Sequence, residues 1–448
     1  MRSITINNFR CYGSKTIDFR PGINLLLGDN SCGKTSLIRA CNFVTNSFFC
    51  GYSDENTTWK SVEEADFKCD VDQNGTVLPE EPIVISFRLA ESDLSPITLK
   101  DNEQYVFDYD RDLCIEKKSR KNSRNLLVGL SPLKKYSSLL YANSHILCEN
   151  SIEQRNALPL YACFTTEDIH VSRKIDRQKF KEYDQKPSFG YFECYDCRGL
   201  FDYWLERMLV LQEANLGELE IQCVRNAVRD CFGPNGCNII EDVFVRPVKR
   251  KVYFKYVDGR VVESSLLSDG YKRLINIVVD VAIRSVLLNK TMYGMESYKH
   301  TYGTVIIDEI DEHLHPALQS TILQALHATF PKIQFIVSTH APLVMSSVKS
   351  SDENVVYRLW YDGERHIYCH EEDETYGLDA NLILEEKMLV KSRNSEVDDK
   401  LKKIQELIGI RDMVNAKRLL AEIEKVTSPS QPSLIKIRAI INRIESRG

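Results

Sequence analysis

The chain has 448 residues, 43% hydrophobic and 27% charged, a balance that is ordinary for a soluble globular protein with a sizeable core. No apolar run approaches the roughly 20 residues of a membrane span, and the start, MRSITINNFR, lacks the apolar stretch of a signal peptide. We therefore expect a cytoplasmic protein with no membrane contact and with its 14 cysteines reduced. The net charge of -6 argues against nucleic-acid binding over the whole surface, but local basic patches remain compatible with it.

The N-terminal segment predicts three strands, then a glycine loop and a helix. SITINNF and KTIDF alternate apolar and polar residues, as half-buried strands do, and INLLLG reads as a buried strand. The following loop, GDNSCGKT, matches the P-loop pattern, whose backbone N–H groups wrap phosphates. In this pattern Lys34 reaches the β and γ oxygens of ATP, and Thr35 ligates Mg²⁺. The predicted nucleotide-binding residues of this segment are Gly28, Asp29, Asn30, Ser31, Cys32, Gly33, Lys34, Thr35 and Ser36.

The middle of the chain predicts an inserted mixed region. IVISFRLA and YVFDYD look like strands, LPLYACF like a core strand, and the segment from Leu200 to Cys231 has helical spacing. The basic runs KKSRKNSR and RPVKRK either face water or contact a phosphate backbone. Cys194 and Cys197 form a CxxC, but no second tight pair follows, which favours buried or incidental thiols over a zinc site.

The later part of the chain predicts a hairpin, a buried helix and two buried strands. VYFKYV and RVVESSLL flank Asp258-Gly259, which suits a two-residue type I′ turn with positive φ at both positions. The hairpin leads into LLSDGYKRL and then into a helix, YKRLINIVVDVAIRSVLL. GTVII and IQFIVST are typical of parallel strands buried on both faces. From about Leu382, three amphipathic helices are expected.

Acidic and polar residues end these two strands. In TVIIDE, Asp308 would hold Mg²⁺ through water, and Glu309 would position or deprotonate the attacking water. In IVSTHAP, His340 can hydrogen-bond the γ-phosphate or the attacking water. We therefore expect Glu309 and His340 to be catalytic, and Thr35 and Asp308 to bind the metal.

The ordered set GDNSCGKT, LSDGYKR, VIIDE and STH resembles ATPases of the ABC class that include SMC, Rad50, RecF and the overcoming-lysogenization-defect proteins. Within that class the sequence is most similar to PtuA, the ATPase subunit of Septu antiphage defence, and to its retron-associated relatives. The resemblance rests on LSDGYKRLINIVVDVA, IDEIDEHLHPALQ, FPKIQFIVSTHAPLV and YGLDANLILE.

The resemblance implies a head-to-tail dimer in which each site combines the P-loop of one chain with the signature of the other. Ser268 and Gly270 would then face the partner's γ-phosphate, Asp311 and His315 would lie near the dimer seam, and Arg10 would approach the nucleotide. Such ATPases complete the Mg²⁺ shell with a glutamine that this sequence lacks at the expected place. Thr166 and Glu167 are the candidates for that position.

The signature departs from its usual form at Asp269. A carboxylate does not favour a neighbouring phosphate. We therefore expect Asp269 to turn aside and cap the helix N–H groups, with Lys272 or Arg273 offsetting its charge.

The predicted fold class is α/β, an ABC-type P-loop ATPase head with an N-terminal antiparallel β subdomain, an inserted mixed region and a C-terminal helical tail. The expected divisions are 1–56 with the P-loop, 57–250 as the inserted region, 251–380 with the signature and acidic strand end, and 381–448 as the tail. A nuclease domain is not expected, since EEDET near Glu371 lies in a segment too short for one.

Two functions are compatible with these motifs. The first is a slow ATPase sensor that restrains a separate HNH nuclease, as the Septu resemblance implies. The second is a DNA-binding repair ATPase of the RecF kind without a nuclease partner.

Overall fold

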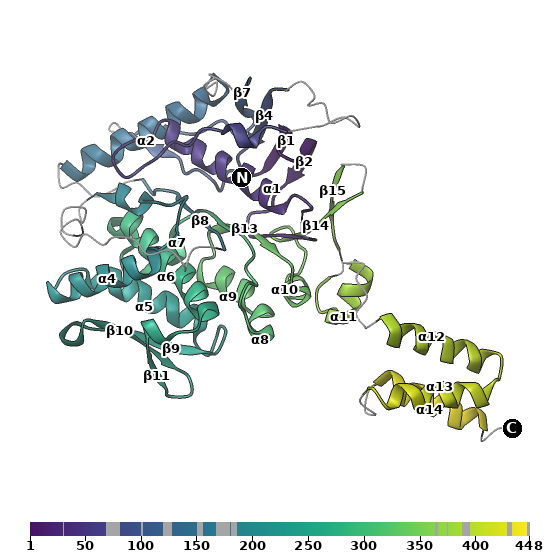
Figure 1. Cartoon of the computed structure of the whole chain (residues 1–448). Coiled ribbons are helices and arrows are strands. Elements are labelled where there is room, and N and C mark those ends of the chain that lie inside the picture. The colour runs from purple at the N-terminus through teal and green to yellow at the C-terminus, as the bar shows by residue number, and fades with distance from the viewer. Residues whose placement is uncertain are drawn as a thin grey trace. The chain divides into compact units, whose positions relative to one another are not determined.

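A six-stranded sheet forms the centre of the computed structural model, with the strand order β15-β14-β3-β13-β12-β8 (Figure 1). All neighbouring strands run parallel except β14 and β15, which are antiparallel. The apolar runs predicted to be buried strands are confirmed, since every residue of β3, β8, β12 and β13 is buried. The strands are β3 (Ile23–Gly28), β8 (Leu160–Phe164), β12 (Gly303–Ile307), β13 (Ile333–Thr339), β14 (Val355–Tyr361) and β15 (Ile367–Glu371).

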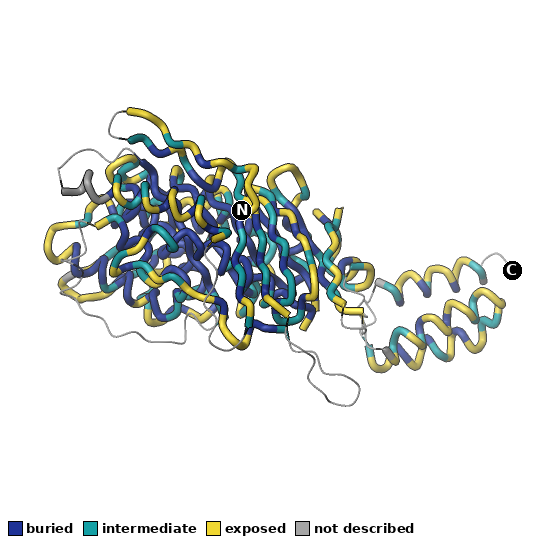
Figure 2. Tube along the Cα trace, turned by 90° about the horizontal axis from the view of Figure 1, so that it is seen from above, coloured by how far each residue is buried: buried dark blue, intermediate teal, exposed yellow. Residues whose placement is uncertain are grey.

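The structure describes residues 1–29, 31–68, 81–99, 102–119, 128–149, 156–166, 180, 186–362, 366–373, 375–387, 395–427 and 432–445. The chain divides into two units, Met1–Leu378 and Asp379–Gly448. Within the described ranges, no helix combines the length and the apolar character needed to cross a bilayer. Buried positions run through the interior of the first unit, whereas the helices of the second alternate buried and exposed positions (Figure 2).

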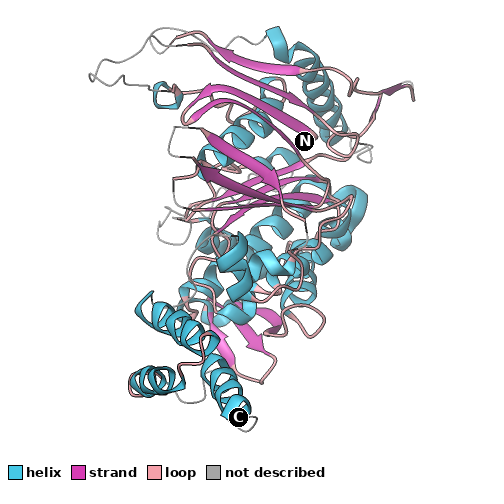
Figure 3. Cartoon of the chain, turned by 90° about the vertical axis from the view of Figure 1, so that its right-hand side faces the viewer, coloured by secondary structure: helices cyan, strands magenta, loops and turns pink. Residues whose placement is uncertain are grey.

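A second, antiparallel sheet has the order β2-β1-β4-β7 and lies as a separate layer (Figure 3). Its strands are β1 (Ser3–Phe9), β2 (Tyr12–Asp18), β4 (Ile83–Arg88) and β7 (Leu113–Lys117). Helix α1 (Lys34–Asn46) contacts strands of both sheets, and its buried face explains why an apolar stripe follows the P-loop. Half of this sheet therefore comes from the inserted region of the sequence.

The strand predicted at YVFDYD is wrong beyond its first residue. Tyr105 is the last residue of β6 (Gln104–Tyr105), which pairs with β5 (Ile97–Thr98) in a two-stranded ribbon. Phe107 instead packs edge-to-face against Tyr109 and Tyr136, so side-chain packing replaces a strand ladder.

Helices cover the other side of the first unit, with α6 at their centre. Helix α6 contacts α4, α5 and β8. Its Arg284 and Asp280 form a buried ion pair, and the Asp280 carboxylate also accepts a hydrogen bond from the Trp204 indole N–H at 2.6 Å. Besides α1, the described α-helices of this unit are α2 (Ser131–Glu149), α4 (Leu200–Glu213), α5 (Glu218–Phe232), α6 (Asp269–Tyr293), α7 (Ser297–His300), α8 (Pro316–Gln319), α9 (Ile322–Thr329) and α10 (Pro342–Ser347). Short 3-10 helices occupy Ser47–Cys50, Glu64–Asp66, Val128–Leu130, Pro187–Tyr191, Pro247–Lys249, Ser264–Leu266 and Gly294–Glu296.

A third sheet, β11-β10-β9, carries the hairpin that precedes α6. It comprises β9 (Ile240–Arg246), β10 (Lys251–Tyr256) and β11 (Val261–Glu263). The hairpin is confirmed, but its type I′ turn is wrong, because only Gly259 has positive φ, at 88°. Tyr256 pairs with Arg260 around a three-residue loop, so the single left-handed position falls on glycine.

The second unit consists of the three predicted amphipathic helices, preceded by a short helical segment. The elements are α11 (Ala380–Leu382), a π-helix (Ile383–Lys387), α12 (Ser395–Gly409), α13 (Met413–Glu424) and α14 (Pro432–Glu445). Their apolar faces form a core of Leu401, Ile404, Ala416, Leu420, Ile423, Leu434, Ile437 and Ile441.

Because this core is separate from that of the first unit, a cavity in it should act locally. Ile404 has no exposed surface, so Ile404→Ala should destabilise the helical unit by about 2–5 kcal/mol. Hydrogen exchange should show lost protection in α12–α14 with unchanged protection in β3, β12 and β13. The matched Ile410→Ala, at a 75% exposed position, should change neither. Lost protection in the central sheet of the Ile404 variant would refute independent cores.

Candidate functional site

The carboxyl ends of adjacent strands gather the polar residues at one edge of the central sheet. Strand β13 lies between β3 and β12, and all three run parallel. The P-loop follows β3, Asp308 and Glu309 follow β12, and His340 follows β13. In open α/β sheets, ligands bind in the crevice at this edge.

The P-loop turns tightly between β3 and α1. Gly33 has φ of 94° at the helix N-cap, and Ser31 has φ of 69°. A Cβ on Gly28 would lie 2.3 Å from the Leu359 carbonyl oxygen, so only glycine lets the loop lie against β14. Asn30 lies outside the described residues.

Lys34 is the buried cation of this loop. Its ammonium donates to the carbonyl oxygens of Gly28 at 2.6 Å and Asp29 at 2.9 Å. Burial lowers the pKa of Lys34, while nearby Cys32, Glu309 and Asp308 oppose that shift. The cation is therefore held where phosphate oxygens would replace carbonyl oxygens as its partners. Thr35 and Ser36 follow it at the start of α1, Thr35 exposed and Ser36 half-buried.

Ser338 organises the acidic strand end. Its hydroxyl donates to the Asp308 carboxylate and accepts from the Glu309 backbone N–H at 2.8 Å. Asp308 is buried, whereas Glu309 is partly exposed and has φ of 51°. One hydroxyl thus contacts both the Asp308 carboxylate and the Glu309 backbone.

His340 lies beside Glu309, with its Nε2 3.5 Å from the Glu309 carboxylate oxygen Oε1. The Asp311 carboxylate accepts from the Thr339 hydroxyl at 2.5 Å and from the His340 backbone N–H at 3.1 Å. Asp311 therefore ties the segment after β12 to the end of β13. His315 is exposed and accepts from the Ala317 N–H at the start of α8.

Thr35 and Asp308 supply oxygen donors to the same cavity, with Thr165 and Thr166 on its wall. Hard oxygen donors from a hydroxyl and a carboxylate fit Mg²⁺, which takes few protein ligands and fills its shell with water and phosphate oxygens. Thr166 is thus one of the two candidates to replace the missing glutamine, and Glu167 lies outside the described residues.

The signature lies at the N-terminus of α6, and the expected role of Asp269 is wrong. Ser268 is the N-cap, Asp269 is the first helical residue, and both are exposed. Within the described chain the Asp269 carboxylate makes no hydrogen bond. Because Ser268 occupies the N-cap position, Asp269 is already inside the helix and does not cap it, and its side chain is exposed to solvent.

Arg273 does not offset Asp269 but faces the acidic strand end of its own chain. Its guanidinium is buried, donates to the Asp308 carbonyl at 2.5 Å and pairs with Glu312 at 2.6 Å. Gly270 also packs there, since a Cβ on it would lie 2.3 Å from the His313 carbonyl oxygen. The start of α6 is therefore locked to residues 308–313.

Arg10 contacts an acid that sequence reasoning missed. Its Nε donates to the buried Asp66 carboxylate at 2.9 Å, and Arg39 of α1 donates to the same group at 2.7 Å. Burial acts to raise the pKa of Asp66, but the hydrogen bonds from Arg39, the Glu63 backbone and Arg10 outweigh it, and the pKa lies below its usual value. No motif marks Asp66 in the sequence, because the contact joins two distant segments.

Residues 23–346 match the family model described as "AAA domain, putative AbiEii toxin, Type IV TA system". A stretch of 104 residues is 47% identical to "Retron Vc95 probable ATPase" of Vibrio cholerae serotype O1 biovar El Tor, covering 23% of this chain and 20% of that protein. A stretch of 122 residues is 35% identical to "Septu protein PtuA" of Bacillus mycoides (strain KBAB4), covering 27% and 16%.

A further stretch of 65 residues is 34% identical to "DNA replication and repair protein RecF" of Lactococcus lactis subsp. lactis (strain IL1403), covering 14% of this chain and 18% of that protein. The matches span a fifth or less of these curated relatives. Among solved structures, the SMC head bound to the C-winged helix domain of ScpA aligns with a TM-score of 0.43 at 13% identity, covering 83% of this chain and 97% of that one.

The resemblance to PtuA and retron ATPases predicted from the motifs is confirmed by these matches. Because the family model spans residues 23–346, well over half of the chain, the protein belongs to the AAA-domain family that this model describes.

Proposed function

We propose that this protein binds ATP with Mg²⁺ and hydrolyses it slowly. The observation that carries the proposal is the convergence of Lys34, Asp308, Glu309 and His340 at the ends of three adjacent parallel strands. Positioning and electrostatics supply nearly all of phosphoryl-transfer catalysis, so a rigid strand edge is a suitable support.

Each residue has a role that its surroundings support. The P-loop N–H groups and Lys34 hold the β and γ phosphates, and Thr35 and Asp308 hold Mg²⁺. When bound, Mg²⁺ would neutralise the negative charge that develops on the phosphate. Glu309 orients or deprotonates water, and His340, 3.5 Å away, restricts its carboxylate and can donate to the γ-phosphate.

The second half of each site comes from another copy in a head-to-tail dimer. Ser268 is exposed at the N-terminus of α6, where free backbone N–H groups attract an anion. Gly270 keeps that turn close to the backbone of residue 313. The signature therefore faces outward while its own helix is anchored to the acidic strand end.

The biological role we propose is that of a cytoplasmic regulatory subunit in an antiphage defence complex that restrains an HNH nuclease. The support is the identity to a Septu PtuA protein and to a retron probable ATPase. The middle region or the helical unit 379–448 would dock the nuclease. Nucleotide occupancy would bias a two-state dimer, and its loss would release the nuclease.

A RecF-like repair ATPase is the second candidate, favoured by the 34% identity over 65 residues. It requires DNA-stimulated hydrolysis and DNA binding that weakens steeply with salt. A hydrolysis rate that is the same with and without DNA would exclude it.

Glu309→Gln should retain ATP affinity within about twofold and lower turnover at least about a hundredfold, because the amide cannot accept the proton of water. Nucleotide binding and phosphate release, measured on the same preparation, separate the two effects. Glu353→Gln, at an exposed acid away from the strand edge, is the control and should hydrolyse ATP normally. Equal turnover in both variants would remove Glu309 from catalysis.

Asp269→Gly should change ATP affinity less than about twofold, because this carboxylate is exposed and contacts no helix N–H. The lost favourable charge at the helix start and the added flexibility should together cost about 1 kcal/mol of stability. Gly270→Ala should instead disturb the α6 start through its clash with the residue 313 carbonyl. Thermal unfolding with ATP titration measures both, and loss of binding in the Asp269 variant would contradict the outward-facing carboxylate.

The defence role is tested by expressing the chain from its native operon. We expect an HNH nuclease encoded by a neighbouring gene to co-purify, and its activity to rise when ATP is depleted. A chain that purifies alone and has no such neighbour would refute the regulatory role without affecting the ATPase proposal.

A further inference from the structure

The turn between β1 and β2 lies along α1 as far as the P-loop. Phe9, the last residue of β1, packs edge-to-face on Phe43 of α1, with ring centroids 6.2 Å apart. Tyr12, the first residue of β2, donates its buried hydroxyl to the Gly33 carbonyl at 3.1 Å. A Cβ added to Gly33 would lie 3.0 Å from that hydroxyl oxygen and 3.2 Å from the Cys11 sulfur. Because Gly33 is the left-handed N-cap of α1, the turn supports the backbone that would wrap a phosphate.

Asp66 joins the middle of this turn to the middle of α1. Its carboxylate is fully buried and accepts from Arg10 Nε at 2.9 Å, from Arg39 Nε at 2.7 Å and from the Glu63 backbone N–H at 3.0 Å. Its backbone carbonyl also accepts from the Arg10 N–H at 2.8 Å. The acid therefore holds both the main chain and the side chain of Arg10, and it links them to the helix that begins at the P-loop.

The backbone of the turn needs this support. Arg10 has φ of 51° and Asn8 has φ of 54°, in the left-handed region that non-glycine residues rarely adopt. Such residues persist only where the surrounding contacts hold them. Asp66 accepts from the Arg10 N–H, and Lys68 donates its N–H to the Asn8 carbonyl at 3.3 Å. The shape of the turn therefore depends on a segment that the sequence places in the inserted region, outside the P-loop part of the chain.

The two arginines on this carboxylate use it differently. Arg39 pairs with both Asp66 and Glu63, so acids match its charge. Arg10 bonds to the carboxylate through Nε alone, and its two terminal nitrogens make no hydrogen bond to the described residues. Its side chain is 29% exposed. A guanidinium held at Nε by a buried acid presents its other N–H groups in a fixed direction, and those groups suit phosphate oxygens.

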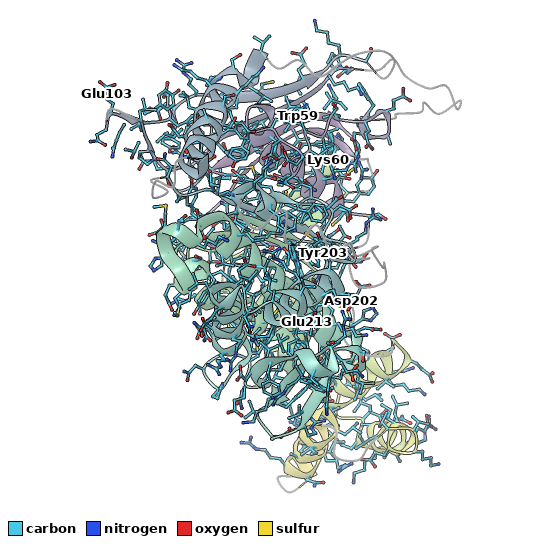
Figure 4. All side chains as sticks on the ribbon, turned by 90° about the vertical axis from the view of Figure 1, so that its left-hand side faces the viewer. Trp59, Lys60, Glu103, Asp202, Tyr203 and Glu213 are labelled. Atoms are coloured by element: carbon cyan, nitrogen blue, oxygen red, sulfur yellow. The ribbon has the colours of Figure 1, made fainter. Side chains whose placement is uncertain are left out.

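A second acid of the first unit also binds two arginines, but in another place. Asp242 of β9 accepts four hydrogen bonds from two arginines of α5, at distances between 2.7 and 3.2 Å. Strand β9 contacts α4. Trp59, which shortly precedes Asp66 in the chain, is well separated from Asp202 of α4 (Figure 4). Asp242 is therefore a chemically matched control for Asp66 that lies away from the P-loop.

We propose that Asp66 is a positioning residue for nucleotide binding. It holds the turn between β1 and β2 so that Tyr12 supports the Gly33 carbonyl and Arg10 presents its terminal N–H groups beside the P-loop. Asp66 itself does not touch the nucleotide. This role rests on the proposed ATP site, and it gives that site a residue from the inserted region that no motif marks.

The test measures ATP and ADP affinity of the full chain by calorimetry, together with KM and kcat for hydrolysis. Asp66→Asn should raise both dissociation constants at least about tenfold, because the turn loses a charged hydrogen-bond acceptor. KM should rise in step while kcat at saturating ATP stays within about threefold, since Glu309 and His340 are untouched. Asp242→Asn also deprives two arginines of their acid, but it should keep both affinities within about twofold.

Tyr12→Phe removes only the hydroxyl on Gly33 and gives an independent reading if the Asp66 variant folds poorly. It should weaken ATP binding about threefold to fivefold. Combined with Asp66→Asn, it should cost less than the product of the two single effects, because both act through one turn.

Unchanged affinity in a folded Asp66→Asn chain, or a lower kcat with unchanged KM, would overturn the positioning role and leave the ATPase proposal intact. The same holds for equal losses of affinity in Asp66→Asn and Asp242→Asn, and for an unchanged Tyr12→Phe chain if the Asp66 variant does not fold. Failure of the unmodified chain to bind ATP would instead refute the ATPase proposal, and this role with it.

Discussion

The parallel alignment of β3, β13 and β12 is the constraint on which the candidate site depends. Parallel strands end at the same edge, and β13 lies between the strand that carries the P-loop and the strand that carries Asp308. This order lets Ser338, near the end of β13, reach both Asp308 and Glu309. Without it, the motifs would be present in the sequence but separated in space.

The second constraint links this edge to the start of α6. Arg273 carries a buried charge that donates to the Asp308 carbonyl and pairs with the Glu312 carboxylate, while its Nε has no hydrogen-bond partner among the described residues. Removing the Glu312 carboxylate would leave the buried guanidinium without its anionic partner, which is strongly destabilising. A shift of the α6 N-terminus must therefore move the acidic strand end or break this pair. An outward-facing signature thus has a direct mechanical route to the acids of its own chain.

The central strands, the P-loop helix and the tail helices could be predicted because each depends on a local pattern of apolar residues. The same holds for the strand-end positions of Asp308 and His340. Asp269, the hairpin turn and Arg10 could not be resolved in this way. Helix α6 has Ser268 rather than Asp269 as its N-cap, and the hairpin loop has one left-handed residue, Gly259, rather than two. Asp66 contacts Arg10 and Arg39 only because folding brings distant segments together. These outcomes depend on competition between tertiary contacts, which spacing alone does not express.

The backbone at Glu309 connects the fold to the proposed chemistry. A non-glycine residue in the left-handed region costs roughly 1–3 kcal/mol and persists only where its surroundings hold it. Here the holding contacts are the Ser338 hydroxyl on its N–H and the Ile310 N–H donating to the Ser338 carbonyl at 3.0 Å. That geometry keeps the Glu309 carboxylate beside His340 while Asp308 stays buried. Two consecutive acids thus occupy different environments, and the turn that separates them suits the different roles proposed for the two carboxylates.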